Sequence, residues 1–447
     1  MAAGVLMTVA NILVMMAGYP VYLHFLGYEQ YGLWLVLTIV LVVAQLGDFG
    51  MGPAVTRLVA QDYGGGDTRG IQQYATMAIT LLCLSGSAVL LGVVLFRSWI
   101  VAAFRLRSED AAMVASLIPY VGVLSIYVFV VHVLDATLSG LGRMDQANYI
   151  QTGGRIVGLI CSTALLYGGI GITGLLIGST IACVFTHVLD VLCIRRAIPF
   201  HLLQMDRWDW ERGKCLVRFG GTVFMGNVVA ALGSPFNKLM VTRYAGVGLV
   251  PAYEIAFTGT MQFRGLIDAA LRPLMPEISR LDGITTLGAT NRMRQVCRRA
   301  MRIILFAGVP AYIGLILLSP VLLQVWLGNR FTQSLPGVFR IMLVASFLSL
   351  VAVPSYYSLM GLGHARDILF ARSITWIVNM VSVTMVAMGT GRLSLTVIGG
   401  CLVVSWTLSS IYLIRRLWCV LRERTEKMPG SGGIRTFPLA HAETISN

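Results

Sequence analysis

The chain has 447 residues, of which 56% are apolar (AVILMFWYC) and only 12% are charged, whereas about 25% of the residues in an average soluble domain are charged. Most charges fall into short clusters separated by long apolar stretches, which excludes a soluble globular protein. The formal net charge of +14 does not predict a nucleic-acid partner, because the basic residues lie between apolar segments, where they determine membrane topology.

Apolar stretches long enough to cross a bilayer recur along the whole chain. We predict about twelve transmembrane helices, at residues 2–25, 30–54, 72–96, 113–140, 149–169, 171–193, 217–244, 248–274, 302–325, 336–361, 369–389 and 394–418. Most of the 34 basic residues, Arg366 and Arg372 among them, lie in the tail and in the loops on one side of the membrane. The positive-inside rule therefore predicts a multi-pass protein of the inner (cytoplasmic) membrane with both termini in the cytosol.

Short patterns in the first half of the chain recur in the same order about half a chain later. Residues 53–58 (PAVTRL) correspond to residues 276–281 (PEISRL), and residues 140–143 (GLGR) correspond to residues 361–364 (GLGH). Each pattern has the same place relative to a predicted span, which indicates a duplicated unit of six helices. Because six is even, both copies enter the membrane from the same side, as a parallel repeat.

The repeat predicts an all-α membrane protein built from two six-helix lobes. We expect the N-lobe at residues 1–193, a cytosolic linker at residues 194–216, the C-lobe at residues 217–418 and a polar, disordered cytosolic tail at residues 419–447. Two rigid lobes around a central cavity can open alternately toward either face of the membrane, which is typical of transporters.

Charged residues inside predicted spans are candidate functional residues, because a charge in the bilayer normally faces a cavity or a partner. Arg264, Asp268 and Arg272 share one helix face, with the acid between two guanidinium groups. These forked donors would suit a diphosphate, with Asp268 orienting them. The alternative is a structural ladder in which Arg272 only reaches the membrane surface.

Two further basic residues are candidates for lining the cavity. Lys238 lies beside Pro235 and Asn237, which suggests a broken helix facing water, although Lys238 could instead extend to the membrane surface. Arg155 shares a polar helix face with Gln151. It could contact sugar hydroxyls or phosphate, or it could only seal the cytosolic opening.

Acidic residues inside the spans are candidates for binding a coupling ion, H⁺ or Na⁺. Asp48 lies in a glycine-rich segment that also favours helix bending or close packing, and Glu254 lies near the outer end of its span, as a gate or an interfacial acid. His132 precedes Asp135 by one helical turn, so the two could form a proton-sensitive pair. The same tetrapeptide, HVLD, recurs at residues 187–190. Hydrogen bonds that help to end the spans are the alternative role for both pairs.

No pattern in the sequence predicts catalysis or a cofactor. There is no GxxxxGK[ST] loop, and the eight cysteines are scattered without a CxxC pair. We therefore expect no catalytic residue, no cofactor and no metal, with transport driven by an ion gradient or by later sugar synthesis.

Several segments resemble one known family. Residues 25–34 (FLGYEQYGLW) and 46–52 (LGDFGMG), followed by Thr56 and Arg57, are similar to the N-terminal pattern of the Wzx-type polysaccharide (O-antigen) flippases. These flippases are a branch of the multidrug/oligosaccharidyl-lipid/polysaccharide exporter superfamily. Residues 253–258 (YEIAFT) and 274–280 (LMPEISR) extend the resemblance into the second half.

The resemblance implies a V-shaped bundle like that of the multidrug and toxin extrusion (MATE) exporters. It also implies a cargo, a polyprenyl-diphosphate-linked oligosaccharide, which moves from the cytosolic to the external leaflet by alternating access. A polysaccharide polymerase is the expected partner, and membrane lipids surround the protein.

Three other functions remain open: an ion-coupled drug/cation antiporter, a lipid II flippase and a membrane polysaccharide polymerase. The buried arginines favour an anionic headgroup over a cationic drug. The longest predicted external loop offers only Glu109 and Asp110 for catalysis, which disfavours the polymerase.

Overall fold

We describe the protein from a computed structural model. The structure describes residues 48–95, 108–199, 209–284, 286–327 and 335–426, and before residue 48 only residues 10, 14, 18, 21–27, 30–34 and 37. Most of the first predicted span and about half of the second therefore lie outside the described residues, as does the chain after residue 426.

The described chain is built from helices that form two lobes. The N-lobe contains α2 (Met51–Gly65), α3 (Thr68–Leu95), α5 (Ser108–Gly140), α6 (Met144–Tyr167) and α7 (Ile172–Ala197). The C-lobe contains most of α8 (Trp210–Tyr244), then η3 (Val247–Leu249), α9 (Val250–Leu271), α10 (Leu274–Asp282), α11 (Leu287–Ile303), η4 (Ile304–Gly308), α12 (Val309–Leu327), α13 (Leu335–Val351), α14 (Val353–Gly361), α15 (Ala365–Thr390) and α16 (Leu395–Glu426).

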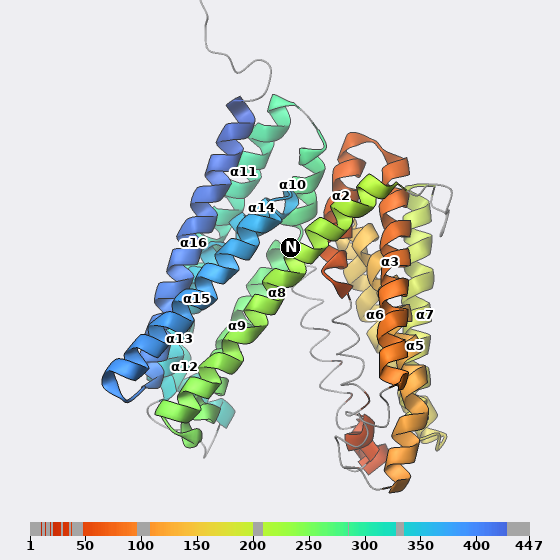
Figure 1. Cartoon of the computed structure of the whole chain (residues 1–447), viewed down its shortest axis with the longest axis horizontal. Coiled ribbons are helices and arrows are strands. Elements are labelled where there is room, and N and C mark those ends of the chain that lie inside the picture. Colours follow the sequence, from red (N-terminus) through yellow and green to blue (C-terminus); the bar gives the residue numbers. More distant parts are fainter. Residues whose placement is uncertain are drawn as a thin grey trace, which may run out of the picture.

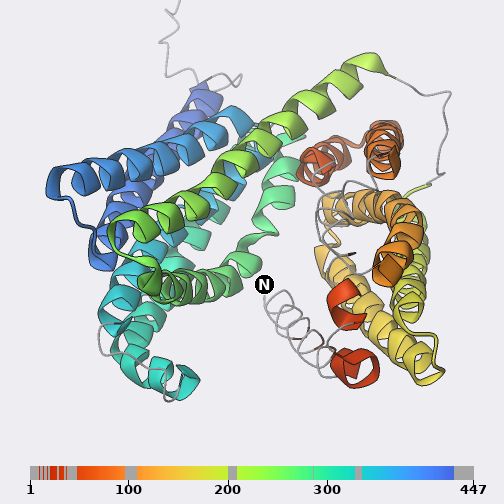
Figure 2. The same cartoon turned by 60° about the horizontal axis from the view of Figure 1, so that its bottom comes forward.

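The two lobes form a V that is joined at one end (Figure 1). α2, α10 and the first turns of α8 lie at this joined end, and the lobes diverge toward the other end. Figure 2 shows α8 running from the side of the N-lobe into the C-lobe, where it packs along α15. The expected two-lobed, V-shaped, all-α architecture is therefore confirmed.

The two copies of the repeated motif meet where the lobes join. α2 carries residues 53–58, and it packs against α10, which carries residues 276–281. The Ser279 hydroxyl donates a 2.6 Å hydrogen bond to the carbonyl of Arg57. Gly140 of the first GLG motif packs against α2, and Gly361 of the second packs against α10. The recurring segments thus build the contact between the lobes.

The predicted spans agree with the helices from the third span onward. Eight helical segments of the described residues are long and apolar enough to cross a membrane. α6 and α9 are not among these eight, and they carry Arg155, Glu254, Arg264 and Asp268. Several of the predicted site residues therefore lie on these two helices.

Some boundaries differ from the expectation. α16 continues to Glu426, so residues 419–426, expected in a disordered tail, are helical. Residues 194–197 end α7, and residues 210–216 begin α8. The break expected near Pro235 is wrong, because α8 is continuous through this residue. A proline removes one backbone hydrogen bond, but the packing of α8 along α15 holds the helix together.

Candidate functional site

The C-lobe contains a cavity of about 310 Å³ between α8, α9 and the helices α13 to α16. Two arginines, one acid and five aromatic rings line it: Arg264, Arg372, Asp268, Phe257, Tyr356, Tyr357, Trp376 and Trp406. Guanidinium groups bind planar anions through paired donors, and aromatic rings offer flat apolar faces. The cavity therefore suits a ligand that combines an anionic group with apolar ring faces.

Two glycines of α8 make room for the α15 side chains in this cavity. A Cβ atom at Gly233 would overlap the ring of Trp376, and a Cβ atom at Gly226 would lie 3.3 Å from Cδ of Arg372. Arg372 and Trp376 share one face of α15, because they are one helical turn apart. Small residues let helices approach closely inside a membrane, so the close packing of α8 on α15 positions both side chains.

Hydrogen bonds orient the polar side chains of the cavity. Arg372 donates from Nη1 to Oδ1 of Asn227 and from Nη2 to the hydroxyl of Tyr356, at 2.9 Å for the second bond. The Tyr357 hydroxyl donates to Oδ2 of Asp268 at 3.0 Å. Within the described ranges no carboxylate pairs with Arg372. Its positive charge is therefore held in place and remains available to an anion.

The three charged residues predicted on one face of α9 separate in the structure. Arg264 and Asp268 line the cavity, and Nε of Arg264 is buried with no hydrogen-bond partner among the described residues. Nε of Arg272 lies 4.0 Å from Oδ2 of Asp268, but the Arg272 side chain is 58% exposed and does not line the cavity. Arg264 and Asp268 are therefore the two that share the cavity.

Lys238 and Glu254 form an ion pair away from this cavity. Their Nζ and Oε2 atoms are 2.8 Å apart, and both side chains are about 40% exposed. The residue directly before Lys238, the buried Asn237, donates from Nδ2 to the Tyr253 hydroxyl at 3.2 Å, which links α8 to α9. Lys238 thus pairs with an acid on α9 and does not lie at a break in the helix, as the nearby Pro235 had suggested.

Arg155 lies in the N-lobe and lines a separate crevice of about 390 Å³. Tyr22, Tyr31 and Ser162 line the same crevice. The Arg155 side chain is exposed. The structure therefore does not bring Arg155 together with Arg264.

The N-lobe contains buried acids. Asp48, Asp135 and Asp190 each have at least one buried carboxylate oxygen without a hydrogen-bond partner in the part of the chain that the structure describes. Asp190 on α7 has no exposed surface, and neither of its oxygens has such a partner. Asp190 lies within electrostatic reach of Asp135 on α5. Because an uncompensated buried carboxylate is unfavourable, this pair can be neutralised by a proton or a small cation.

The predicted His–Asp pairs are wrong as hydrogen-bonded pairs. Among the described residues, Oδ1 of Asp135, both oxygens of Asp190 and Nδ1 of His187 have no hydrogen-bond partner. His132 instead interacts electrostatically with Asp48, and the His187 ring stacks on Tyr127 at a centroid distance of 5.6 Å. The spacing placed each histidine near its acid along the helix, but packing against neighbouring helices turned the side chains to other partners.

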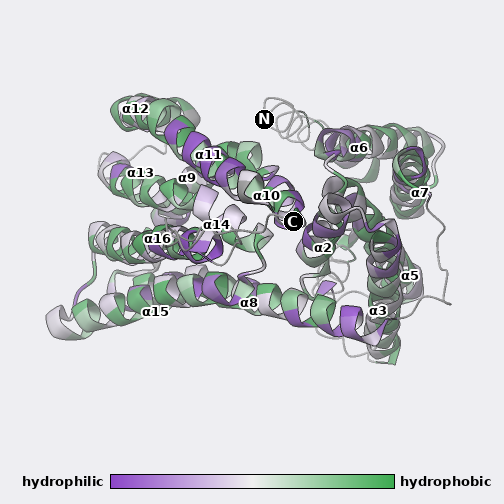
Figure 3. Cartoon of the chain, turned by 90° about the horizontal axis from the view of Figure 1, so that it is seen from above, coloured by the Kyte–Doolittle hydropathy of each residue, from purple (hydrophilic) through white to green (hydrophobic). Residues whose placement is uncertain are grey.

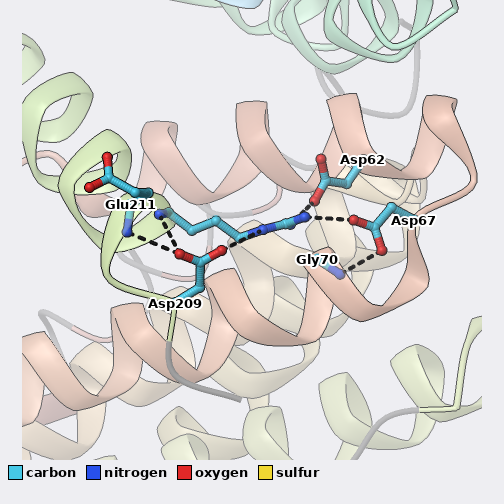
Figure 4. Close-up of polar contacts among 6 residues, drawn as sticks. Asp62, Asp67, Gly70, Asp209 and Glu211 are labelled. Atoms are coloured by element: carbon cyan, nitrogen blue, oxygen red, sulfur yellow. Dashed lines mark hydrogen bonds and ion pairs between the residues drawn. The ribbon is translucent and has the colours of Figure 1, made fainter.

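Arg212 links the two lobes at the joined end. It stands at the start of α8 and bonds Oδ2 of Asp62 at 2.6 Å and Oδ2 of Asp67 at 2.7 Å, both in the N-lobe (Figure 4). Asp209 caps α8 by accepting from the backbone N–H of Glu211, and it lies 3.5 Å from Nε of Arg212. One guanidinium thus holds three carboxylates across the junction.

The pKa values of the two N-lobe acids of this cluster, Asp62 and Asp67, shift in opposite directions. Burial raises the pKa of Asp62 despite the nearby Arg212 charge. Burial acts in the same direction on Asp67, but hydrogen bonds from the Gly70 N–H and from Arg212 outweigh it and hold the pKa of Asp67 below its usual value. Asp67 therefore keeps the negative charge that pairs with Arg212 at neutral pH.

The sequence reasoning missed Arg372, Tyr356 and Tyr357, and also Arg212 with its acids. The charge pattern groups Arg372 with the cytosolic loops, at the edge of the predicted span 369–389, whereas the structure places it about two helical turns inside α15 (Ala365–Thr390). Its position one helical turn before Trp376 could have identified it, because an arginine and an aromatic residue then share one face of the helix. The tyrosines follow the interruption between α13 and α14, next to Pro354, which the sequence alone did not place.

The comparisons with known proteins agree with this architecture. A family described as polysaccharide biosynthesis protein matches residues 24–336. No curated protein matches the chain.

Solved structures show the same fold. The MATE transporter VcmN of Vibrio cholerae in its bent form superposes with a TM-score of 0.82 at 14% identity, covering 95% of this chain and 97% of that one. An outward-facing multidrug resistance MATE transporter of the MOP superfamily superposes with a TM-score of 0.77 at 14% identity and 95% coverage of both chains. The fold is therefore that of the MATE transporters, and the family match over most of the chain shows that this protein belongs to the polysaccharide biosynthesis protein family.

Proposed function

We propose that the protein is a flippase that moves polyprenyl-diphosphate-linked oligosaccharides from the cytosolic to the external leaflet. One observation carries this proposal: Arg264 and Arg372 share a C-lobe cavity with five aromatic rings. Arginine forks bind phosphate oxygens in pairs, and tryptophan and tyrosine rings can pack on the apolar faces of sugars. Membership in a polysaccharide biosynthesis family supports the same cargo.

The size of the cavity limits what it can hold. Its volume of about 310 Å³ is at the lower end of the range of small-ligand pockets, about 300 to 1,000 Å³. It therefore fits the diphosphate with the first sugar rather than a complete oligosaccharide. The remaining sugars and the lipid tail extend outside the cavity, so the C-lobe recognises the part of the cargo shared by different glycans.

We infer that the joined end of the lobes faces the cytosol. Figure 3 looks onto this end, where α10 and α11 carry many hydrophilic residues. Basic residues of α11 and of the end of α16 belong to this end, because Arg424 pairs with Asp282 at the end of α10. The positive-inside rule supports this orientation. Transport then alternates between this state and one in which α2 and α10 have separated.

Ion coupling fits the N-lobe acids. The buried pair Asp135 and Asp190 can take up H⁺ or Na⁺, and binding or release of that ion would change the charge inside the N-lobe. Asp48 and His132 form a second titratable pair beside it. The proposal therefore places cargo recognition in the C-lobe and ion coupling in the N-lobe.

The buried acid pair also favours a second candidate, a drug/cation antiporter, because antiport needs an ion site of this kind. The cavity with two arginines argues against it, since like charges repel a cationic drug. The two functions differ in cargo and can be separated directly.

Lipid analysis tests the proposal. Mass spectrometry of polyprenyl-diphosphate lipids is carried out in cells lacking the protein, with the wild-type chain restored as control. We expect one lipid-linked oligosaccharide to accumulate in the cytosolic leaflet and to disappear on complementation. Normal lipid levels, in cells without a second flippase, would refute the flippase and favour the antiporter.

A further inference from the structure

A second, larger crevice lies between the lobes at their joined end. Its volume is about 860 Å³, and it is separate from the C-lobe cavity. The N-lobe contributes Arg57 of α2 and Leu81 of α3, and the C-lobe contributes the first turns of α8 and the start of α15. The crevice therefore exists only when the lobes are joined as in this structure.

The charges in this crevice are mostly positive. Its cations are Arg57, Lys214, Arg218 and Arg366. Its acid is Glu211, whose Oε1 already binds Nζ of Lys214 at 2.7 Å. Arg218 and Arg366 are exposed, and within the described ranges neither has an acidic partner.

Cations from both lobes converge on the crevice. Arg57 is only 9% exposed, and its Nε donates to the carbonyl of Gly361 in the C-lobe at 3.3 Å. Arg218 and Arg366 stand on the C-lobe wall. Asp282 lies within electrostatic reach of Arg57 and offsets part of its charge. Arg218 and Arg366, however, have no carboxylate partner among the described residues, so the remaining positive charges repel one another across the junction. A bound anion would remove that repulsion and favour the joined arrangement.

The apolar lining distinguishes a lipid from a free anion. Leu81, Val217 and Phe219 line the same crevice as the cations, and a soluble phosphate would make no use of them. Trp210 packs near Nζ of Lys214, with the ring centroid 5.9 Å away. Tryptophan, lysine and arginine beside apolar residues are typical of the membrane surface.

The length of α8 agrees with this location. Its 35 residues span about 52 Å at about 1.5 Å per residue, compared with about 30 Å for the hydrocarbon core of a bilayer. The helix is therefore longer than the hydrocarbon core, and the charged residues of its first turns favour this end at the level of the lipid headgroups. A crevice at this level is within reach of those headgroups.

We propose that this crevice binds the headgroup of an anionic phospholipid, such as phosphatidylglycerol, and that the bound lipid stabilises the joined lobes. Arg218 and Arg366 contact the phosphodiester, and Leu81, Val217 and Phe219 contact the beginning of the acyl chains. The proposal does not depend on the identity of the transported cargo.

Native mass spectrometry of the purified full-length protein tests the site. The protein is titrated with phosphatidylglycerol and, in parallel, with phosphatidylcholine, and bound lipid is counted for the wild type and for Arg218→Gln with Arg366→Gln. Each cation near an anionic headgroup contributes roughly five-fold in affinity, so we expect the double variant to bind phosphatidylglycerol about 25-fold more weakly. Arg218→Lys with Arg366→Lys keeps both charges and should retain most of the binding.

Two controls make the result decisive. Arg392→Gln removes an exposed cation outside this crevice and should leave phosphatidylglycerol binding unchanged. Equal binding of phosphatidylcholine, or unchanged binding in the double Gln variant, would overturn the proposal. Inorganic phosphate that displaces phosphatidylglycerol at millimolar concentration would show a site for free anions and would also overturn it.

Discussion

The two lobes share a duplicated sequence, yet their interiors carry opposite charges. The C-lobe holds Arg264 and Arg372 in one cavity, and its acid there, Asp268, accepts a hydrogen bond from Tyr357. The N-lobe holds Asp135 and Asp190 with carboxylate oxygens that lack hydrogen-bond partners among the described residues. Two lobes of related sequence thus carry different side chains inside: those of the C-lobe suit an anion, and those of the N-lobe suit a cation. The difference supports a division of work between cargo recognition and ion coupling.

Removing the C-lobe charges tests one side of this comparison. Arg264→Gln with Arg372→Gln should lower lipid-linked oligosaccharide transport at least about ten-fold, because each lost hydrogen bond from a charged group contributes about 1.5 to 3 kcal/mol. The measurement is transport by reconstituted protein in vesicles. Lys238→Gln is the matched control, since Lys238 pairs with Glu254 outside the cavity. Unchanged transport in the double variant would contradict the assigned role.

Neutralising an N-lobe acid tests the other side. Asp190→Asn should abolish the dependence of transport on a pH or Na⁺ gradient, a loss of about five- to 150-fold for a typical coupling free energy of about 1 to 3 kcal/mol. Cargo binding in the C-lobe should remain. Transport is followed with and without each gradient, and the exposed Asp145→Asn serves as control. If transport by Asp190→Asn still depends fully on the gradient, the acid pair is not the site of ion coupling.

The junction between the lobes can be weakened without touching either interior. A Cβ atom at Gly64 would overlap the carbonyl oxygen of Arg280, so Gly64→Ala should push α2 away from α10. Gly65→Ala is the control, because its Cβ atom would meet the oxygen of Gly283 at an ordinary 3.6 Å.

Spin labels at Arg69→Cys and Arg292→Cys, one in each lobe, report the separation of the lobes by electron paramagnetic resonance once the exposed Cys215 and Cys419 are replaced by serine. We expect a longer mean distance and a transport rate lowered several-fold in Gly64→Ala only. Identical distance distributions in both alanine variants would show that this contact does not hold the lobes together.

The smallest expected effect concerns the orientation of the cavity acid. Tyr357→Phe removes the 3.0 Å hydrogen bond to Asp268, which should weaken cargo binding by about 0.5 to 1.5 kcal/mol, or roughly two- to ten-fold. The KM for the lipid-linked substrate measures this change. Tyr412→Phe removes a comparable 2.9 Å bond to Asp367 outside the cavity and should leave KM unchanged. An equal effect of both substitutions would point to general destabilisation.

Much of the fold was predictable from the sequence, because bilayer thickness fixes the length of an apolar helix and a repeat fixes the relation of the lobes. Arg264 and Asp268 were also identified correctly as neighbours, because both lie on one helix and helical spacing is regular. Arg372 was not, because its contacts depend on how α15 packs against α8 and α14, and Asn227 on α8 lies 145 residues away in the chain. The Arg212 cluster was missed for the same reason.

The sequence by itself determined a helical membrane protein with two related halves and a strong excess of basic residues at one side. Those properties follow from local composition and periodicity, which act within a single helix. Only the tertiary structure decided which charges meet: Arg264 with Arg372 in a cavity, Lys238 with Glu254, and Arg212 with Asp62 and Asp67. Each of these groupings depends on how separate helices pack. A charged side chain in a low-dielectric interior is held by the neighbours that this packing supplies.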